Sequence, residues 1–392
     1  RQAGRLKGGM AKIAQRMAYG AGLGGVDDEA ARALLGALWD RAPARSAAEI
    51  AAVVAAELGG PPEKIFARWN RTPLAAASLG QVHEAEGQDG APLAVKVQYP
   101  GVAEALRADL ASPAFARRLA GTELGKRLDP GAIDALRAAI LGELDYVAEA
   151  DALERFAVAF AGEPGMAIPS VDRTRSSRRV LTMTRMRGRP LAEVAASADL
   201  ATRAATARLV FRFTWGGPLR HGLLHADPNP GNFLVDGEGD GVQLAFLDFG
   251  CTSVLPAAVV AGERAMWSGV ISTDPFAGAE RFRMSLQAQG LLGRASAVNS
   301  VAHRTWENAV TRPFVAAGPG PGEMVWTSAY AAELAEAIAR ATAAGTLVLP
   351  PAHVMLWRQR VGVAAVLGSL NAPADWRGLL GELLHTEAAD DW

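Results

Sequence analysis

Two short segments of this chain contain the residue types that phosphoryl transfer requires. One reads His225-Ala-Asp227-Pro-Asn-Pro-Gly-Asn232, and Asp248-Phe-Gly begins sixteen residues after Asn232. The reaction needs a group that orients the nucleophile, and it needs oxygen ligands for magnesium. Asp227 suits the first task, and Asn232 and Asp248 suit the second. The alternative is a capped turn in which the aspartates bond nearby backbone, but two such segments at this distance favour a catalytic loop with its metal ligands.

A lysine in an apolar run is the second candidate for contact with phosphate. Lys96 lies in Ala94-Val-Lys96-Val, and the apolar residues around it predict a buried strand over Leu93–Val97. A lysine in that position neutralises nucleotide phosphates and requires a carboxylate on a helix to hold it. Glu149 is the expected partner, in a predicted helix that also carries Glu143-Leu-Asp145. A surface lysine on an edge strand is the alternative that Lys96 alone leaves open.

The histidines and the single cysteine do not suggest a metal centre of their own. His221 and His225 have the spacing of a zinc-protease helix, but the glutamate that should follow the first histidine is absent. We therefore expect His225 to bond backbone near the predicted catalytic loop. Cys251 directly follows Asp-Phe-Gly, and we expect it to be a small packed side chain.

Three regions must position these residues: first a set of helices, then a small lobe with both strands and helices, and then a large helical lobe. Residues 1–60 have apolar residues at helical spacing, and two prolines then interrupt the pattern. Residues 61–186 hold the predicted strands, at Leu79–Ala85, Leu93–Val97, Ile168–Asp172 and Arg179–Met186. Residues 187–392 are mostly helical in pattern, apart from the short apolar runs Phe233–Val235 and Leu244–Leu247. This order predicts an α+β fold with a nucleotide cleft between two lobes.

Composition excludes some classes of partner. Half of the 392 residues are hydrophobic and 21% are charged, with a net charge of −1 and a pI near 6.7. Because the chain has no overall basic field, nucleic acid is not an expected partner. One cysteine cannot form a disulfide within the chain, which fits a reducing, cytoplasmic compartment. No apolar run approaches the roughly 20 residues of a membrane-spanning helix, so we expect membrane contact to be peripheral.

Three further segments resemble the UbiB/ADCK family of atypical protein-kinase-like proteins. The run Leu74-Ala75-Ala76-Ala77-Ser78-Leu79-Gly80-Gln81-Val82-His83 resembles the family's alanine-rich nucleotide loop. Glu143-Leu-Asp145 is similar to its ExD motif. Lys12-Ile-Ala-Gln15 is similar to its N-terminal KxGQ motif, with Ala14 in place of the glycine. The resemblance runs from about Arg5 to Cys251, and the helical tail after it carries no motif.

The resemblance implies a protein-kinase-like fold with an N-terminal helical extension and a mostly helical C-terminal lobe. It also implies ATP and Mg²⁺ as ligands. Lys96 would pair with Glu149 and contact the phosphates. Asp227 would occupy the catalytic-loop position, and Asn232 and Asp248 would occupy the metal positions.

The resemblance assigns nucleotide contacts to other residues as well. Lys12 and Gln15 would reach over the cleft, with Lys12 near Glu143 and Asp145, and would block the place of a protein substrate. Because alanine restricts the backbone more than glycine does, residues 75–77 should form a stiffer phosphate lid than a glycine-rich loop. A helix that starts here with Ser78 as its cap is the alternative.

The function that these observations favour is that of an ATP-binding atypical kinase or ATPase that supports quinone or other isoprenoid-lipid metabolism. Its partners would be nucleotide and a quinone-like lipid or membrane surface. A small-molecule phosphotransferase of the aminoglycoside/choline kinase kind is an alternative, although such enzymes lack the residue 12–15 and 143–145 motifs. A nucleotide-binding scaffold without turnover is the other alternative, against which the complete set of candidate site residues argues.

Overall fold

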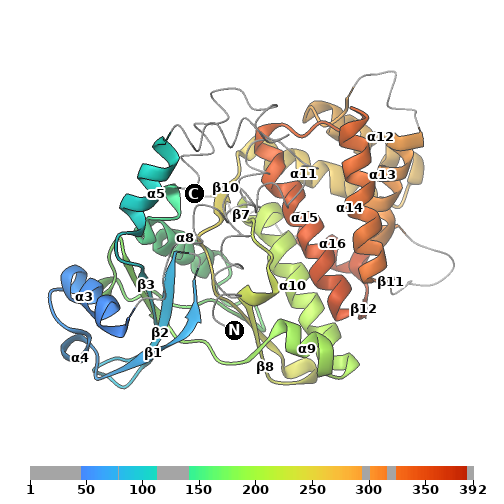
Figure 1. Cartoon of the computed structure of the whole chain (residues 1–392). Coiled ribbons are helices and arrows are strands. Elements are labelled where there is room, and N and C mark those ends of the chain that lie inside the picture. Colours follow the sequence, from blue (N-terminus) through green and yellow to red (C-terminus); the bar gives the residue numbers. More distant parts are fainter. Residues whose placement is uncertain (1–45, 78, 113–140, 294–300, 316–323, 386–392) are drawn as a thin grey trace. The chain divides into compact units, whose positions relative to one another are not determined.

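The computed structural model describes residues 46–77, 79–112, 141–293, 301–315 and 324–385 (Figure 1). Lys12, Gln15 and Ser78 therefore lie outside the described residues. The chain divides into two compact units. One contains the chain up to Val158 together with Pro169–Met186, and the other contains Ala159–Ile168 and Arg187–Trp392.

The first unit is built on a four-stranded antiparallel sheet in the order β1-β2-β3-β5. The strands are β1 (Arg68–Ala76), β2 (Gly80–Glu86), β3 (Pro92–Gln98) and β5 (Val180–Thr184). Its helices are α3 (Ala47–Leu58), α4 (Pro62–Ile65), α5 (Val102–Ala111) and α8 (Tyr146–Ala159), with a 3-10 turn, η2, at Arg173–Arg175. The predicted strands over Leu79–Ala85 and Leu93–Val97 are thus present.

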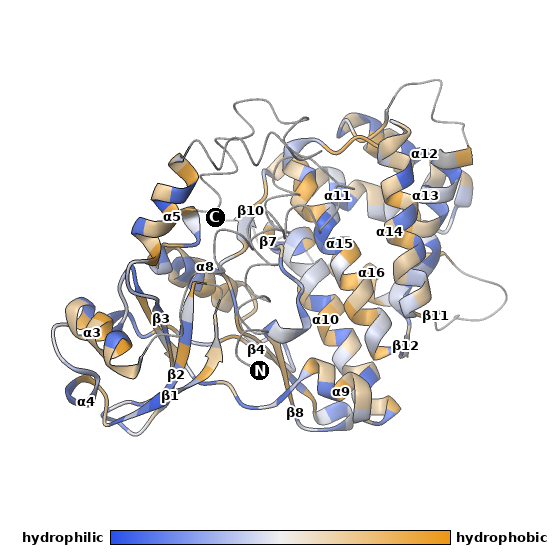
Figure 2. Ribbon diagram, viewed as in Figure 1, coloured by the Kyte–Doolittle hydropathy of each residue, from blue (hydrophilic) through white to orange (hydrophobic). Residues whose placement is uncertain are grey.

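Helix α3 packs on one face of this sheet. It begins with a capping box, in which Ser46 and Glu49 bond each other's backbone, and ends at Gly59 in the left-handed conformation. The side chains of α3 that face the sheet are buried with Val95 and Val97 of β3. Figure 2 shows apolar and polar residues interspersed along α3, as expected for a helix that buries one side. Because side chains alternate along a strand, Lys96 points to the opposite face.

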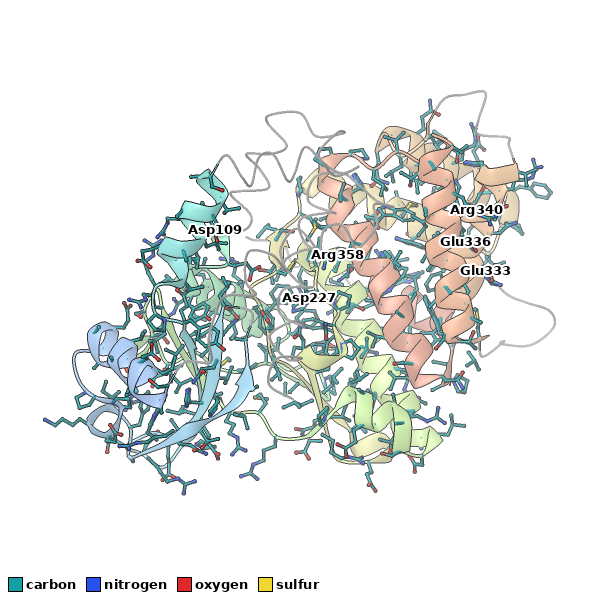
Figure 3. The ribbon with its side chains drawn as sticks, viewed as in Figure 1. Asp109, Asp227, Glu333, Glu336, Arg340 and Arg358 are labelled. Carbon is teal, nitrogen blue, oxygen red and sulfur yellow. The ribbon has the colours of Figure 1, made fainter. Side chains whose placement is uncertain are left out.

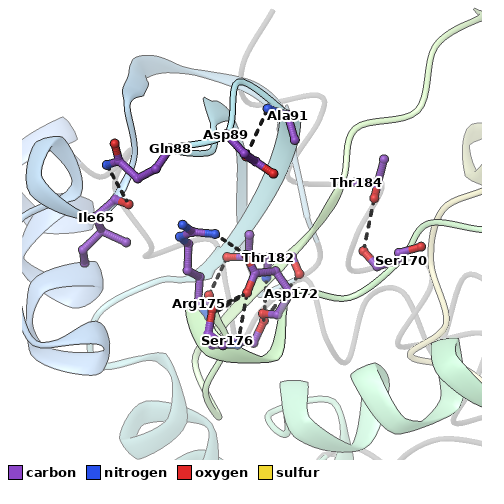
Figure 4. A network of polar contacts seen from close by, with 11 residues as sticks. Ile65, Gln88, Asp89, Ala91, Ser170, Asp172, Arg175, Ser176, Thr182 and Thr184 are labelled. Atoms are coloured by element: carbon purple, nitrogen blue, oxygen red, sulfur yellow. Dashed lines mark hydrogen bonds and ion pairs between the residues drawn. The ribbon is translucent and has the colours of Figure 1, made fainter.

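Two elements of the first unit differ from the sequence prediction. Strand β1 was not predicted, because most of its side chains are exposed and its sequence does not alternate. The strand expected over Ile168–Asp172 is wrong, since only Val171 makes an isolated bridge, to Met183. Asp172 instead accepts hydrogen bonds from the backbone N–H groups of Thr174 and Arg175. Thr182 of β5 donates to Ser176 Oγ and to the backbone oxygen of Arg175, so the turn is bonded to β5 (Figure 4).

The second unit is mainly helical. Its helices are α9 (Leu191–Ser197), α10 (Leu200–His221), α11 (Ala257–Val270), α12 (Pro275–Ala288), α13 (Val301–Thr311), α14 (Ser328–Ala343), α15 (Pro351–Leu370) and α16 (Trp376–His385). Its 3-10 turns are η3 (Pro230–Asn232), η4 (Gly239–Gly241) and η6 (Arg312–Phe314). An aromatic core joins α10, α11, η6 and α16, in which Trp215 of α10 contacts Trp267 and Phe314, and Phe211 contacts Trp376. The number and length of these helices confirm the mostly helical character predicted for the C-terminal part.

Short strands of the second unit carry the predicted catalytic segments. A four-stranded sheet has the order β4-β9-β8-β6, from β4 (Met166–Ala167), β6 (Arg189–Pro190), β8 (Phe233–Asp236) and β9 (Gln243–Phe246). Two further pairs join β7 (Leu223–His225) with β10 (Thr252–Val254), and β11 (Met324–Val325) with β12 (Pro373–Ala374). Residues 159–168, which the sequence analysis placed in the first lobe, group with this unit because β4 pairs with β9.

No helix within the described ranges combines the length and the apolar composition that crossing a membrane requires.

Candidate functional site

The loop from Ala226 to Asn232 connects β7 to β8 and is held by its own side chains. The Asn229 side chain accepts a bond from Gly231 N at 2.8 Å, which closes the 3-10 turn η3. Asn232 is buried, and its Nδ2 donates to the backbone oxygen of Asp227 at 3.1 Å and to the carboxylate Oδ2 at 2.9 Å. The two residues that the sequence singled out in this loop therefore contact each other directly.

The Asp248 segment lies at the same end of the β8–β9 hairpin as Asn232. Phe233 pairs with Phe246 in this antiparallel hairpin, and Leu247 N donates to the backbone oxygen of Asn232 at 3.0 Å. Asp248 is half-buried, and its Oδ1 accepts from Gly250 N at 3.1 Å. Antiparallel pairing is the reason that residues sixteen apart in sequence meet at one hairpin end.

His225 joins the two segments. Its Nε2–H donates to the backbone oxygen of Asp248 at 2.6 Å, because a carbonyl can only accept. The ring lies edge-on to Phe213 and Phe249, and β10 pairs with β7 so that Thr252 lies opposite His225. The expectation that His225 bonds backbone near the loop is confirmed. Its partner, Asp248, could not be read from the sequence.

Cys251 is buried beside these segments, in an apolar cluster with Leu224, Ala226, Leu255 and Leu356. Its backbone oxygen accepts from Ala226 N at 2.8 Å. The residue thus has the packing environment that the sequence predicted, and its main-chain bond also holds the loop that starts at Ala226.

The donor chemistry of this part of the second unit suits a hard divalent cation. Asp227 and Asp248 supply carboxylate oxygens, and magnesium prefers such ligands. Asn232 uses its amide nitrogen for Asp227, so it would contact a cation through its side-chain oxygen. Over the residues that the structure describes, no group of three or more His, Cys, Asp or Glu side chains could hold a metal. Asn232 would add an amide oxygen to the carboxylate ligands of a cation bound here.

Lys96 and Glu149 form a buried ion pair in the first unit. Lys96 Nζ donates to both carboxylate oxygens of Glu149, at 2.8 and 2.7 Å, and the two side chains are 8% and 5% exposed. The Tyr146 ring lies 4.9 Å from Nζ. Because β3 has neighbours on both sides, the alternative of a surface lysine on an edge strand is wrong.

The segment before α8 corrects one expectation. Glu143 and Asp145 were predicted inside the helix that carries Glu149, but α8 begins at Tyr146. Asp145 Oδ1 accepts from Val147 N at 3.1 Å, as a cap of the helix, and Oδ2 pairs with Arg178 at 3.0 Å. Glu143 lies in the preceding turn.

Gln98 fixes the same segment to the sheet, two residues after Lys96 and on the same face. Its Nε2 donates to the backbone oxygen of Leu144 at 2.9 Å and to that of Arg178 at 3.2 Å. The start of α8, and hence the position of Glu149, is therefore tied to strand β3.

The alanine-rich segment spans the end of β1 and the start of β2. Ala75 and Ala76 end β1, and Ala77 N donates to Gly80 O at 2.9 Å. The alternative of a helix that begins here is wrong, because strands lie on both sides of the turn. A Cβ on Gly80 would lie 2.0 Å from Val97 O, so only glycine allows β2 to approach β3 this closely.

Residues of α15 contact His225 and the predicted catalytic loop, and nothing in the sequence indicated these contacts. Gln359 Nε2 donates to His225 O at 3.2 Å, and the backbone at Gly362 passes against the Pro228 ring. They belong to the helical tail, where no motif pointed to a role.

Comparison with known proteins gives concordant similarities. The profile of the ABC1 atypical kinase-like domain matches residues 37–280. The protein ACTIVITY OF BC1 COMPLEX KINASE 8, chloroplastic, of Arabidopsis thaliana is 33% identical over 247 residues, which are 62% of this chain and 32% of that protein. The mitochondrial atypical kinase COQ8 of Saccharomyces cerevisiae is 34% identical over 203 residues, 51% of this chain and 39% of that protein. This chain thus matches less than half the length of these relatives.

A solved structure extends the similarity beyond the profile. The complex of Rv3197 with erythromycin from Mycobacterium tuberculosis has a TM-score of 0.68 at 28% identity, and the match covers 94% of this chain and 90% of that one. A match of this coverage necessarily includes much of the tail after residue 280.

Proposed function

Since this chain belongs to the family of ABC1 atypical kinase-like domains, we propose that it binds ATP with Mg²⁺ and cleaves the terminal phosphate. The observation that carries the proposal is the union of the Asp227 loop with the Asp248 segment through His225. Phosphoryl transfer needs positioning and charge stabilisation more than covalent chemistry. A preformed pair of segments with two carboxylates and one amide fits that requirement.

Each residue of the second unit has a proposed task. Asp227 would orient the attacking oxygen and accept its proton. Asn232 and Asp248 would hold the cation, which would neutralise charge on the phosphates when bound. The bond from Asn232 Nδ2 keeps the Asp227 carboxylate oriented within the loop, and the bond from Gly250 N does the same for Asp248.

The first unit would contribute phosphate contacts. Lys96 would bind phosphate oxygens while Glu149 holds its ammonium group in place, an arrangement typical of kinases. The alanine-rich segment, residues 75–78, would cover the phosphates. The nucleotide contacts of Lys12, Gln15, Glu143 and Asp145 also belong to the proposal, as the resemblance to the UbiB/ADCK family implies.

The acceptor of the phosphate is the finer part of the proposal. We propose that water or a small lipid-like molecule accepts it, rather than a protein, because the N-terminal motif would occupy a protein substrate's place. The activity would serve quinone or other isoprenoid-lipid metabolism, with peripheral contact to a membrane surface. Only a minor part of the curated relatives' length matches, so these roles are inferred for this chain and rest on the site residues.

The experiment is nucleotide turnover by purified protein with Mg²⁺, alone and with vesicles that contain quinone-like phenols. Phosphate release stimulated by the vesicles is the expected result. Transfer to choline or an aminoglycoside would support the small-molecule phosphotransferase instead. Binding of ATP without turnover in any of these mixtures would indicate a scaffold. Asp227→Asn should remove turnover, while Asp240→Asn on an exposed turn of the same unit should not.

A further inference from the structure

We propose that α15 positions the catalytic loop, with Gln359 and Gly362 as positioning residues. This inference rests on the proposed function of that loop. The helix lies in the tail beyond residue 280, outside the match to the ABC1 profile. Figure 3 labels Arg358 on this helix and Asp227 in the loop. The tail would then be part of the catalytic machinery, and not only a structural support.

The first contact is a buried hydrogen bond. Gln359 is 1% exposed, and its Nε2 donates to the backbone oxygen of His225 at 3.2 Å. His225 in turn donates from its ring to the backbone oxygen of Asp248. Gln359 therefore bonds the residue that joins the two segments of the site. A buried carbonyl left without its donor is costly, so this bond constrains where His225 lies.

The second contact is a close approach of backbone to a proline ring. A Cβ on Gly362 would lie 2.5 Å from Cγ of Pro228, which is nearer than van der Waals contact allows. Pro228 immediately follows Asp227. Because Gly362 lies three residues after Gln359, both fall on one side of α15, and Leu356 on the preceding turn packs against Ala226 and Cys251.

The remaining side of α15 fixes the helix in place. Arg360 is 7% exposed, bonds Glu263 of α11 at 3.1 Å and lies 3.4 Å from the Trp215 ring centre. Trp267 Nε1 donates to the same carboxylate at 2.9 Å. Burial lowers the pKa of Arg360 to about 10, and Glu263 opposes that change, so Arg360 stays charged at neutral pH.

A helix fixed in this manner cannot rotate without breaking a buried ion pair, which is costly. Its contacts with the loop therefore determine where the loop residues lie. A shift of Pro228 would displace Asp227 and, through the Asn232 bond, the amide that we assign to the cation. A displacement of about 1 Å at reacting groups can lower a rate about 100-fold. The effect should appear in kcat and in the Mg²⁺ requirement more than in nucleotide affinity.

The test is Gly362→Ala, with Gly381→Ala in α16 as the matched control. Both substitutions place alanine in a helix, which alanine favours. A Cβ on Gly381 would meet only Ile271 Cδ1, at 3.7 Å, an ordinary contact. We expect kcat for ATP to fall at least about 10-fold in Gly362→Ala with the ATP dissociation constant within about threefold of wild type. The control should match wild type in both.

Hydrogen exchange of the loop peptide, residues 225–233, gives a readout that does not depend on turnover. Faster exchange in Gly362→Ala than in Gly381→Ala supports the proposal. Equal exchange, or a kcat equal to that of the control, overturns it. If wild type itself has no turnover, the proposed function fails and the exchange result alone decides the positioning role. If Gly362→Ala does not fold, Gln359→Met, which removes the donor and keeps the volume, decides by the same measurements.

Discussion

Replacing Lys96 with methionine should separate the two tasks of this residue. In the first unit Lys96 and Glu149 share two hydrogen bonds of 2.7–2.8 Å with side chains only 5–8% exposed. Lys96→Met would leave the Glu149 carboxylate buried without its lysine. Removing one partner of a buried pair costs about 3–5 kcal/mol of unfolding free energy. A second substitution, Glu149→Leu, removes the buried carboxylate as well and should restore most of that loss.

The assay combines guanidinium denaturation with calorimetry of ATP binding for wild type, Lys96→Met and the double variant. Stability should fall and then recover, while ATP affinity stays low in both variants, because neither has the phosphate-binding ammonium. Arg68→Met is the control, since the Arg68–Glu86 pair is exposed and should change stability by less than about 1 kcal/mol. A Lys96→Met protein as stable as the control, or a double variant with wild-type ATP affinity, would refute the reasoning.

Three further predictions concern the hairpin, the histidines and the N-terminus. Gly80→Ala should destabilise the protein by about 1–3 kcal/mol, because its Cβ would lie 2.0 Å from Val97 O, whereas Gly60→Ala, with its nearest atom at 4.0 Å, should behave as wild type in the same denaturation experiment. Burial lowers the pKa of His83, His221 and His353. The unfolded protein therefore binds more protons than the folded protein as the pH falls below the ordinary histidine pKa of about 6.5. The free energy of unfolding should be highest above that pH and should decrease below it. Denaturation curves that coincide at pH 7.5 and 5.5 would contradict this. Lys12→Ala should change both melting temperature and ATP turnover, and a variant equal to wild type in both would remove Lys12 from the site.

The structure brings together pairs of residues that the sequence singled out, Lys96 with Glu149 and Asp227 with Asn232, although it places some of the surrounding elements differently. Strand β3 and its lysine were predictable because apolar residues flank Lys96, whereas β1 was not, because most of its side chains are exposed. The start of α8 was misplaced although Asp145 is a favoured capping residue that could have indicated it.

The contacts that complete the site come from tertiary structure. His225 reaches the backbone oxygen of Asp248, and any residue type could supply that oxygen. Gln359 and Gly362 lie more than a hundred residues from the loop they contact, and a glutamine or glycine in a helix has no distinctive pattern. Such contacts depend on how the helices pack, which residue spacing alone does not specify.

The most direct test of the central claim is calorimetry of ATP binding with and without Mg²⁺ for wild type, Asp248→Asn and Asp240→Asn. Asp248→Asn removes a carboxylate charge from the proposed cation site, and Asp240→Asn makes the same change on an exposed turn. We expect Mg²⁺ to strengthen ATP binding in wild type and in Asp240→Asn, and to have no effect in Asp248→Asn. The same Mg²⁺-dependent affinity in all three proteins would contradict the assignment of Asp248 as a metal ligand and, with it, the proposed function of the site.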